Sequence, residues 1–393
     1  MKIPDQLRRD PDRHGLTPLL EQMNRDQRER PTPLERNTLR TQRIATAYAE
    51  IAPLFDHIVL KGFTHVPDFT PDPNLRVQYD LDLYVPPSQK EKARDALIAI
   101  GYEPIGRMEG LAMDHLPTMV RKTGWQWRGD YFDPDLPPAV EVHFRFWDEE
   151  TERLPAEGVE KFWDRREGHQ LAPIDKLGYA ALHLTRHLLR GNVKVFHAWE
   201  LANFLDTHRD PAFWNEWRAL HSPSLRRLEA VAFLLARTWF ECAIDLEEID
   251  ALPPRVHRWF DRYRWSPVEG SNKHELWLHT SLVATTADRI SILRRRLIPV
   301  SLPGPIDAIH LPNPSLARRA LSAIRNTTYA ASRTAHHARL FLPTLLEGVK
   351  WRAGFSPRGA SAPHPSQSPL PPHSEIPPAN SATPPPTNSA PHP

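Results

Sequence analysis

The sequence of 393 residues contains a single cysteine, Cys242, and lacks any long hydrophobic run. One cysteine excludes a disulfide framework and a cysteine-rich zinc site, and its apolar neighbours predict a small core residue. No segment approaches the ~18 consecutive apolar residues of a membrane span, and residues 1–30 contain no apolar signal region. The formal net charge of +2 creates no global field toward nucleic acid or membrane. These absences favour a cytoplasmic protein without a membrane partner.

Proline, in contrast, is abundant, with 42 residues, and it is most frequent toward the C-terminal end. Residues 353–393 consist largely of Pro, Ser, Ala, Asn and His. Such a composition cannot bury enough apolar surface to fold, so it predicts a disordered tail. Residues 1–32 are rich in Arg, Asp and Pro and are predicted to form a polar N-terminal arm. The chain between these ends is long enough for two domains with their own cores.

A strictly alternating pattern occupies residues 80–85, Asp-Leu-Asp-Leu-Tyr-Val. Because successive side chains of a strand point to opposite faces, this pattern predicts a strand with one apolar face. Asp80 and Asp82 then share the other face, at roughly 6.5 to 7 Å between their Cα atoms. Two carboxylates so close repel each other, and a divalent cation between them removes the repulsion. Oxygen ligands of this kind suit Mg²⁺.

A second alternating stretch, residues 140–146, supplies a third acid. Glu141, His143 and Arg145 share its polar face. Two acids on one strand and a single acid on a later strand form the arrangement used in two-metal phosphoryl chemistry. Glu141 could instead be an exposed strand residue or an ion-pair partner of Arg145, and His143 a structural histidine.

Four motifs occur in order along the chain: Lys61-Gly62; Arg76-x-x-x-Asp80-x-Asp82-Leu83-Tyr84-Val85; a helix that ends in Gly101-Tyr102; and Glu141-Val142-His143. This ordered set resembles the uncharacterised nucleotidyltransferase family of the polymerase-β-like superfamily. Most of that superfamily carries Gly-Ser where this chain has Lys61-Gly62. The resemblance implies a nucleotidyltransferase-type α/β (α+β) domain with a mixed sheet, Mg²⁺ or alternatively Mn²⁺ as cofactor, and an NTP as substrate.

Each basic residue near the acids has more than one interpretation. Lys61 is either a solvated loop lysine or a point charge that reaches the triphosphate, with Gly62 allowing backbone N–H groups to approach the phosphates. Arg76 could clamp a phosphate, pair with the acids, or form a purely structural ion pair. His183 and His187 have the i, i+4 spacing of metal ligands, although packing is the more frequent role of such a pair. They match a His-x-x-x-His of the resembled family, which leaves a substrate-facing role open.

Helical periodicity appears on both sides of the two strands. Residues 33–53 predict a helix whose apolar side includes Leu39 and Ile44, and residues 88–100 predict another that starts with a capping box at Ser88 and ends at Gly101. From residue 174 onward the period is helical throughout. The predicted organisation is therefore a catalytic domain over residues 33–165 and a mainly α-helical domain over residues 166–352.

These patterns predict an enzyme that transfers a nucleoside monophosphate from an NTP to an acceptor hydroxyl. Asp80, Asp82 and Glu141 are the expected metal ligands and catalytic residues; Lys61, Gly62 and Arg76 are the expected nucleotide contacts. His143, His183 and His187 are expected on the acceptor side, because the helix that carries the last two can pack near the acids. A small molecule, a peptide, a protein or an RNA could each be the acceptor. A metal-dependent phosphoesterase or nuclease, and a catalytically silent nucleotide-binding module, are the alternatives.

Overall fold

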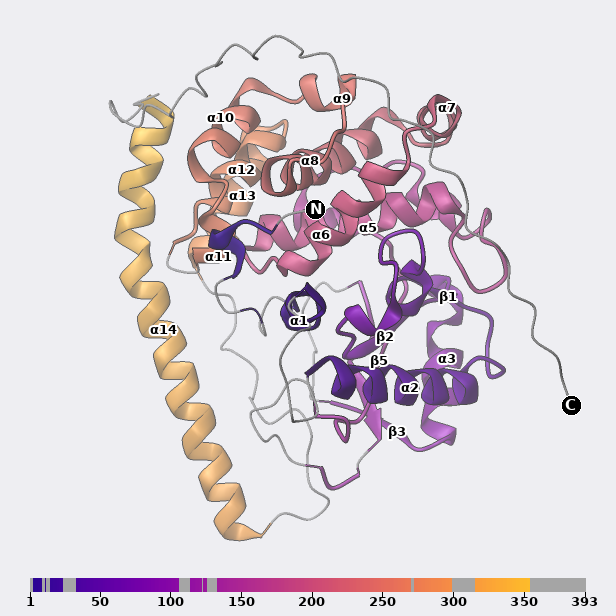
Figure 1. Cartoon of the computed structure of the whole chain (residues 1–393). Helices are drawn as coiled ribbons and strands as arrows, with labels where there is room; N and C mark the ends of the chain where they lie inside the picture. The colour runs from indigo at the N-terminus through magenta and orange to yellow at the C-terminus, as the bar shows by residue number, and fades with distance from the viewer. Residues whose placement is uncertain are drawn as a thin grey trace, which may run out of the picture.

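The computed structural model describes residues 3–8, 11, 15–23, 33–105, 114–121, 123–125, 133–269, 272–298 and 315–353. Apart from residue 353, the segment predicted to be a disordered tail lies outside these residues. A mixed sheet with flanking helices forms one part of the molecule and a helical layer forms the other, which confirms the predicted fold class (Figure 1).

The sheet has five strands in the order β1-β2-β5-β4-β3. Only β2 and β5 are parallel, whereas β1 is antiparallel to β2 and β4 is antiparallel to both β3 and β5. The strands are β1 (Ile58–Val59), β2 (Asp80–Tyr84), β3 (Tyr102–Pro104), β4 (Met119–Arg121) and β5 (Ala139–His143). The two strands predicted from their alternation are thus the adjacent parallel pair at the centre of the sheet.

Two helices, α2 (Pro33–Ile51) and α3 (Lys90–Ala99), cover the apolar face of this sheet. Leu81 and Leu83 of β2 are fully buried in the core cluster that these helices share with the sheet. The expectation for Leu39 was wrong, because this side chain is 51% exposed. Arg40 is buried instead and donates from Nε to the carbonyl oxygen of Gln78 at 2.9 Å.

The second helix also begins differently from its prediction. Ser88 lies in a short 3-10 turn, η4 (Pro87–Gln89), and α3 begins at Lys90 without a side-chain cap. The predicted end is correct, since Gly101 has φ +90° directly after the last turn.

The helical layer confirms the helical period seen after residue 174. Its helices are α5 (Pro173–Arg190), α6 (Val195–Thr207), α7 (Pro211–Leu220), α8 (Pro223–Phe240), α9 (Glu247–Asp250), α10 (Pro254–Tyr263), α11 (Ser266–Glu269), α12 (Glu275–Leu282) and α13 (Thr286–Leu297). Trp217, Trp239 and Trp259 are fully buried in its core, and Cys242 is buried there as predicted.

Part of the expected N-terminal arm packs against this larger core. It contains η1 (Asp5–Arg8) and α1 (Thr17–Met23), and Leu7 and Leu16 are fully buried. The remaining short elements are η2 (Gly62–His65), η3 (Pro73–Leu75), α4 (Glu149–Glu152) and η5 (Val159–Phe162).

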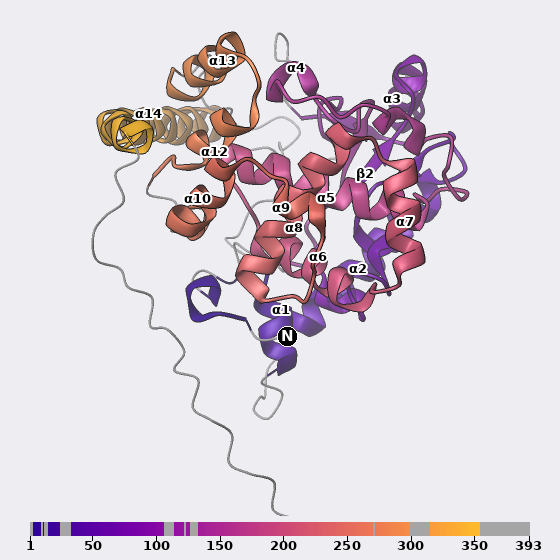
Figure 2. The ribbon, with the colours of Figure 1, turned by 90° about the horizontal axis from the view of Figure 1, so that it is seen from above.

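A last helix, α14 (Leu316–Ala353), is much longer than the others and runs along one side of the molecule. Figure 2 shows it nearly end-on, beside α10, α12 and α13.

Candidate active site

The polar face of the sheet, opposite α2 and α3, carries the acids predicted from the sequence. Asp82 of β2 lies directly beside Glu141 of β5 in the parallel register, and Tyr84 lies beside His143. Neighbouring strands are roughly 4.8 Å apart, so side chains paired in this way meet on one face. Ligand atoms of Asp82, Glu141 and His143 all lie within 4.8 Å of one another. The register therefore brings the predicted third acid to the Asp-x-Asp pair.

Asp80 and Asp82 differ in their exposure although they share a strand. The side chain of Asp80 is 30% exposed, whereas that of Asp82 is 2% exposed. Asp80 is thus the carboxylate at the mouth of the site and Asp82 the one at its base.

Lys61 bridges these two carboxylates. Its Nζ lies 2.7 Å from Asp82 Oδ2 and 3.4 Å from Asp80 Oδ1. Burial opposes the charge of this amine, but the two acids raise its pKa above the usual value. Leu60, the residue before it, donates its backbone N–H to the carbonyl oxygen of Asp82 at 2.9 Å, which fixes the chain beside β2. Lys61 is therefore a member of the acidic cluster and not a solvated loop lysine.

Gly62 provides the space that this arrangement needs. It has φ +89°, and a Cβ atom on it would lie 2.3 Å from Gln78 Nε2. That amide is itself fixed, because Gln78 Nε2 donates to the carbonyl oxygen of Asp80 at 2.8 Å. A side chain at position 62 would therefore disturb both Lys61 and the strand that carries the acids.

We expect Gly62→Ala to lower the free energy of unfolding by roughly 2–4 kcal/mol, from the left-handed backbone and the lost Gln78 hydrogen bond. Gly101→Ala is the matched control. Gly101 has φ +90°, but a Cβ atom on it would meet no other atom within 4 Å, so it reports the backbone cost alone. That cost is about 1 kcal/mol. Denaturant unfolding of both variants measures the difference, and equal losses would contradict a specific role for the space at Gly62.

His143 connects the acids to a buried ion pair that the sequence did not indicate. Its Nε2 lies 3.1 Å from Asp82 Oδ1 and its Nδ1 lies 3.5 Å from Asp114 Oδ2. Asp114 is in turn paired with Arg186 of α5. Burial alone would lower the pKa of His143, but the hydrogen bonds and charges of Asp114 and Asp82 raise it to about 9. The two carboxylates therefore favour the charged form of His143, which hydrogen-bonds to Asp82 through Nε2 and forms an ion pair with Asp114.

Glu141 is the acid whose surroundings favour a proton. Burial and the charges of Asp80 and Asp82 raise the pKa of its carboxyl. Thr118, directly before β4, donates from Oγ1 to Glu141 Oε1 at 2.8 Å and orients the group. A carboxyl group of raised pKa is suited to accept a proton.

Arg76 lies away from the two aspartates and is paired with Glu200 of α6. Its Nε donates to Glu200 Oε1 at 2.8 Å, and both side chains are nearly inaccessible to solvent. His65 and Thr70 also hydrogen-bond to the same carboxylate oxygen. Burial would raise the pKa of Glu200, but the charges of Arg76 and His65 hold it well below its usual range. Neither a charge pattern nor a spacing in the sequence indicated Glu200.

His183 and His187 lie one turn apart on α5. Their Nε2 atoms are 3.1 Å apart, and the ring of His197 lies 4.9 Å from that of His183. Burial lowers the pKa of both α5 histidines, and neighbouring histidines and cations lower it further. His183, Tyr179, Lys61 and Arg76 line one small cavity. The helix predicted to approach the acids therefore does so.

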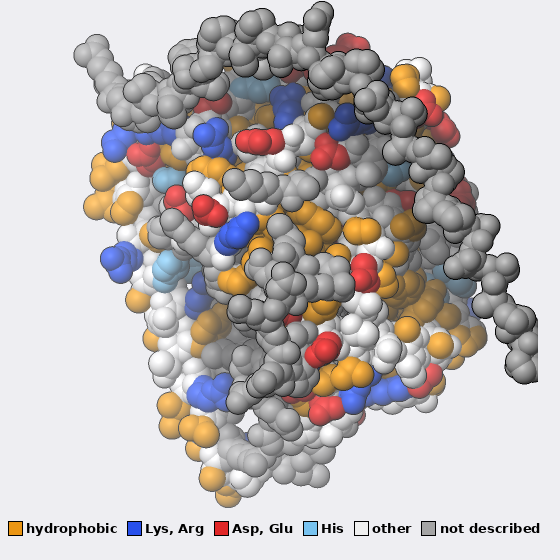
Figure 3. Space-filling model, in the orientation of Figure 1, with side chains coloured by type: hydrophobic (Ala, Val, Ile, Leu, Met, Phe, Trp, Pro, Cys, Tyr) orange, Lys and Arg blue, Asp and Glu red, His pale blue; other side chains and the backbone are white. Residues whose placement is uncertain are grey.

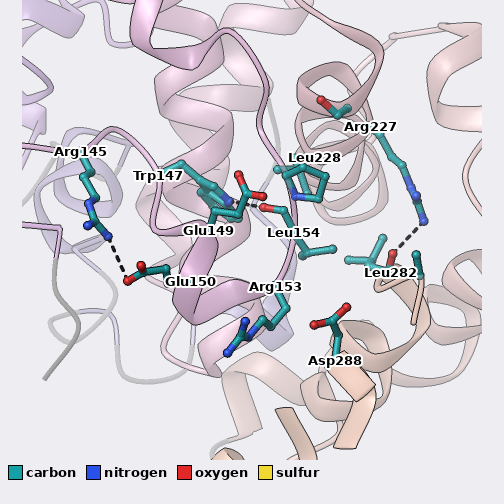
Figure 4. A pocket seen from close by; sticks show the side chains of 13 residues that line it. Arg145, Trp147, Glu149, Glu150, Arg153, Leu154, Arg227, Leu228, Leu282 and Asp288 are labelled. Carbon is teal, nitrogen blue, oxygen red and sulfur yellow. Dashed lines mark hydrogen bonds and ion pairs between the residues drawn. The ribbon is translucent and has the colours of Figure 1, made fainter. Parts of the chain in front are cut away.

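A larger cavity lies elsewhere, between α4, α8 and α13 (Figure 4). It has a volume of about 650 Å³, and Arg153, Arg227 and Asp288 are among its lining residues. None of the clustered acids borders it. Of its lining, only Arg145 is close in sequence to the site, two residues after His143. The size of this cavity is therefore not a reason to regard it as the active site.

A mixed sheet with two acids on one strand, a third on the adjacent parallel strand and a cationic side chain between them defines a nucleotidyltransferase-type protein. The model of a family described as uncharacterised nucleotidyltransferases matches residues 12–241, and the chain belongs to this family. No curated protein and no solved structure matches the chain. Among the described helices, none combines the length and the apolar character needed to cross a membrane.

Proposed function

We propose that this protein transfers a nucleoside monophosphate from an NTP to an acceptor hydroxyl with the help of Mg²⁺, with Mn²⁺ as an alternative. The observation that carries the proposal is the parallel pairing of β2 with β5. It places Asp82 beside Glu141, with Asp80 on the same face two residues earlier. Membership of the nucleotidyltransferase family supports the same reaction class.

The donor set fits a hard divalent cation. Asp80, Asp82 and Glu141 offer carboxylate oxygens, which are the ligands that Mg²⁺ and Mn²⁺ prefer. His143 is less suited as a ligand, because its Nε2 is hydrogen-bonded to Asp82 and its ring forms an ion pair with Asp114. We assign it the role of holding Asp82 in place. When bound, the metal would polarise the phosphoryl oxygens and lower the pKa of the acceptor hydroxyl.

The remaining roles follow from the positions of the side chains. Glu141 would accept the proton of the acceptor hydroxyl, since its pKa is raised. Lys61 and Gly62 lie where the triphosphate would meet the acids, so the ammonium would neutralise charge on the leaving pyrophosphate. Arg76 keeps one guanidinium nitrogen, Nη2, without a hydrogen bond within the described part of the chain. Arg76 lines the same small cavity as Lys61, so we assign this donor the role of contacting a phosphate oxygen.

The acceptor would enter from the side of α5. His183 and His187 are held neutral there, so they can donate or accept a hydrogen bond without adding charge. This arrangement is compatible with a hydroxyl group of a small molecule, a peptide, a protein or an RNA.

Incubation with each α-labelled NTP, Mg²⁺ and fractionated cell extract tests the proposal. The expected result is label on one component together with release of pyrophosphate. Release of a nucleoside monophosphate from NTP or of nucleotides from nucleic acid, without label transfer, would favour the phosphoesterase or nuclease alternative. Nucleotide-induced thermal stabilisation without any product would favour the silent binding module, because a ligand of the native state alone raises its stability.

A further inference from the structure

Helix α14 contacts the rest of the protein through one face near its C-terminal end. Glu347 pairs with Arg262 and accepts a hydrogen bond from Tyr263 Oη at 2.5 Å, both from α10. Gly348 lies against the indole of Trp277, and the ring of Trp351 lies 5.8 Å from that of Tyr263. Positions 344, 347, 348 and 351 recur at helical spacing, and Thr344 is 3% exposed. They define the inner face of α14.

The opposite face is apolar and uncovered. Leu342, Leu345, Leu346 and Val349 also recur at i, i+3, i+4 and i+7, offset from the inner face. Val349 is 67% exposed and Leu342 is 61% exposed. Five turns earlier, Ile324 lies at the same angle around the helix and is 63% exposed. Figure 3 shows hydrophobic side chains along the outer edge of the molecule where α14 runs, with Lys and Arg side chains among them. The outer face is therefore an apolar stripe that the rest of the described chain does not bury.

The charged residues of α14 are almost all basic. Its sequence contains seven basic residues and a single acid, Glu347, which is already paired on the inner face. The basic residues are Arg318, Arg319, Arg325, Arg333, Arg339, Lys350 and Arg352. The rest of the chain is acidic, because the formal net charge of the whole chain is only +2 while this helix alone contributes +6. Positive charge is thus concentrated on the element that exposes an apolar stripe.

We infer that α14 is a docking helix for an anionic lipid surface, with its outer face against the acyl boundary and its basic side chains toward the headgroups. An apolar face flanked by Arg and Lys is the composition of helices that lie in the plane of a membrane interface. A second copy of this chain is a poorer occupant, because two helices of the same positive charge repel each other. Nucleic acid would satisfy the charge but would leave the leucine side chains uncovered.

This inference is independent of the proposed function, and it concerns attachment to a membrane surface. The expectation of no membrane partner rested on the lack of a spanning segment and on a small net charge. Neither observation bears on a helix that lies along the surface, because net charge averages over the basic helix and the acidic remainder. Attachment through α14 would keep the protein at the surface of the bilayer.

Co-sedimentation of the full chain with vesicles tests the inference. We expect binding to phosphatidylcholine vesicles that contain about 30% phosphatidylglycerol to exceed binding to pure phosphatidylcholine by about tenfold or more. The triple substitution Leu342→Ser, Leu346→Ser and Val349→Ser should reduce binding to the anionic vesicles by about tenfold. Arg339 and Arg352 border the two sides of the stripe, so Arg339→Glu with Arg352→Glu should do the same and should also weaken the salt dependence of binding.

Leu39→Ser is the matched control, since Leu39 is a 51% exposed helical leucine on α2. It should bind vesicles as the wild type does, and circular dichroism should show that all variants stay folded. Equal binding to both vesicle types, no binding to either, or full binding by the triple variant would overturn the inference. A dimer that the triple substitution converts to a monomer would assign the stripe to a second copy. RNA binding without vesicle binding would assign the helix to nucleic acid.

Discussion

Asp80→Asn is expected to lower the rate of nucleotidyl transfer by at least about three orders of magnitude, because it removes one of the carboxylates that we propose as metal ligands. Asp80 is the better test than Asp82, since its side chain is 30% exposed and its only described ion pair is with Lys61. Asp82 is buried between Lys61 and His143, so Asp82→Asn would leave two cations with less compensation. We therefore expect Asp82→Asn to lose activity and also to unfold more easily, whereas Asp80→Asn should lose activity alone.

Pyrophosphate release, Mg²⁺ titration and thermal unfolding of the two variants separate these effects. Asp95→Asn on α3 is the control, because Asp95 is an exposed carboxylate on the far side of the sheet and should change neither quantity. An Asp80→Asn enzyme with more than about a tenth of wild-type turnover would remove the metal assignment.

Glu200→Ala is expected to cost roughly 3–5 kcal/mol of unfolding free energy, because it leaves the guanidinium of Arg76 buried without its partner. Arg76 is 4% exposed, so water cannot take over the role of the carboxylate. Glu200→Gln should be milder, since one amide oxygen can still accept the hydrogen bonds of Arg76 and Thr70.

The pH dependence has a defined sign. The folded-state pKa of Glu200 is lowered, so its contribution is fully present above the pKa of the unfolded chain, near 4.5, and is lost as the pH falls below it. Denaturant unfolding from pH 5 to pH 8 should therefore show a constant gap between wild type and Glu200→Gln. The double variant Arg76→Met, Glu200→Leu should recover part of the loss, because an apolar pair replaces a buried ion pair at little cost. A loss below about 1 kcal/mol in Glu200→Ala would show that Arg76 finds another partner.

The strands of the site could be predicted because the pattern that identifies them lies within a few consecutive residues. Asp80 and Asp82 alternate with buried leucines, and a period of two needs no knowledge of the rest of the fold. The contacts of Asp114, Arg76 and Glu200 could not be predicted, because they join residues that are far apart in the sequence. The prediction that Leu39 is buried failed for a related reason. The helix itself was predicted correctly, but Arg40 is buried in place of Leu39 because it hydrogen-bonds to a backbone carbonyl group that is distant in the sequence.

The start of α3 and the outer face of α14 show a second limit of prediction from the sequence. Ser88 has the residue type and spacing of a cap, yet the two prolines before it place the chain in a 3-10 turn, so the helix starts two residues later. The leucines of α14 have the period of a core-facing helix, yet they point to solvent. Periodicity states which side chains share a face, but not what that face meets.

The ion pairs between the sheet and the helical layer limit how far the protein can be treated as two modules. Arg186 of α5 reaches Asp114 beside the acids, and Glu200 of α6 holds Arg76 at the entrance to β2. A chain cut near residue 165 would retain every metal ligand we propose, but both Asp114 and Arg76 would lose their partners. The half that carries the proposed metal ligands therefore cannot be joined to another helical layer by simple fusion. A new helical layer would have to supply an arginine opposite Asp114 and a carboxylate opposite Arg76. The contacts between the two halves are therefore needed to keep the residues around the acids in place.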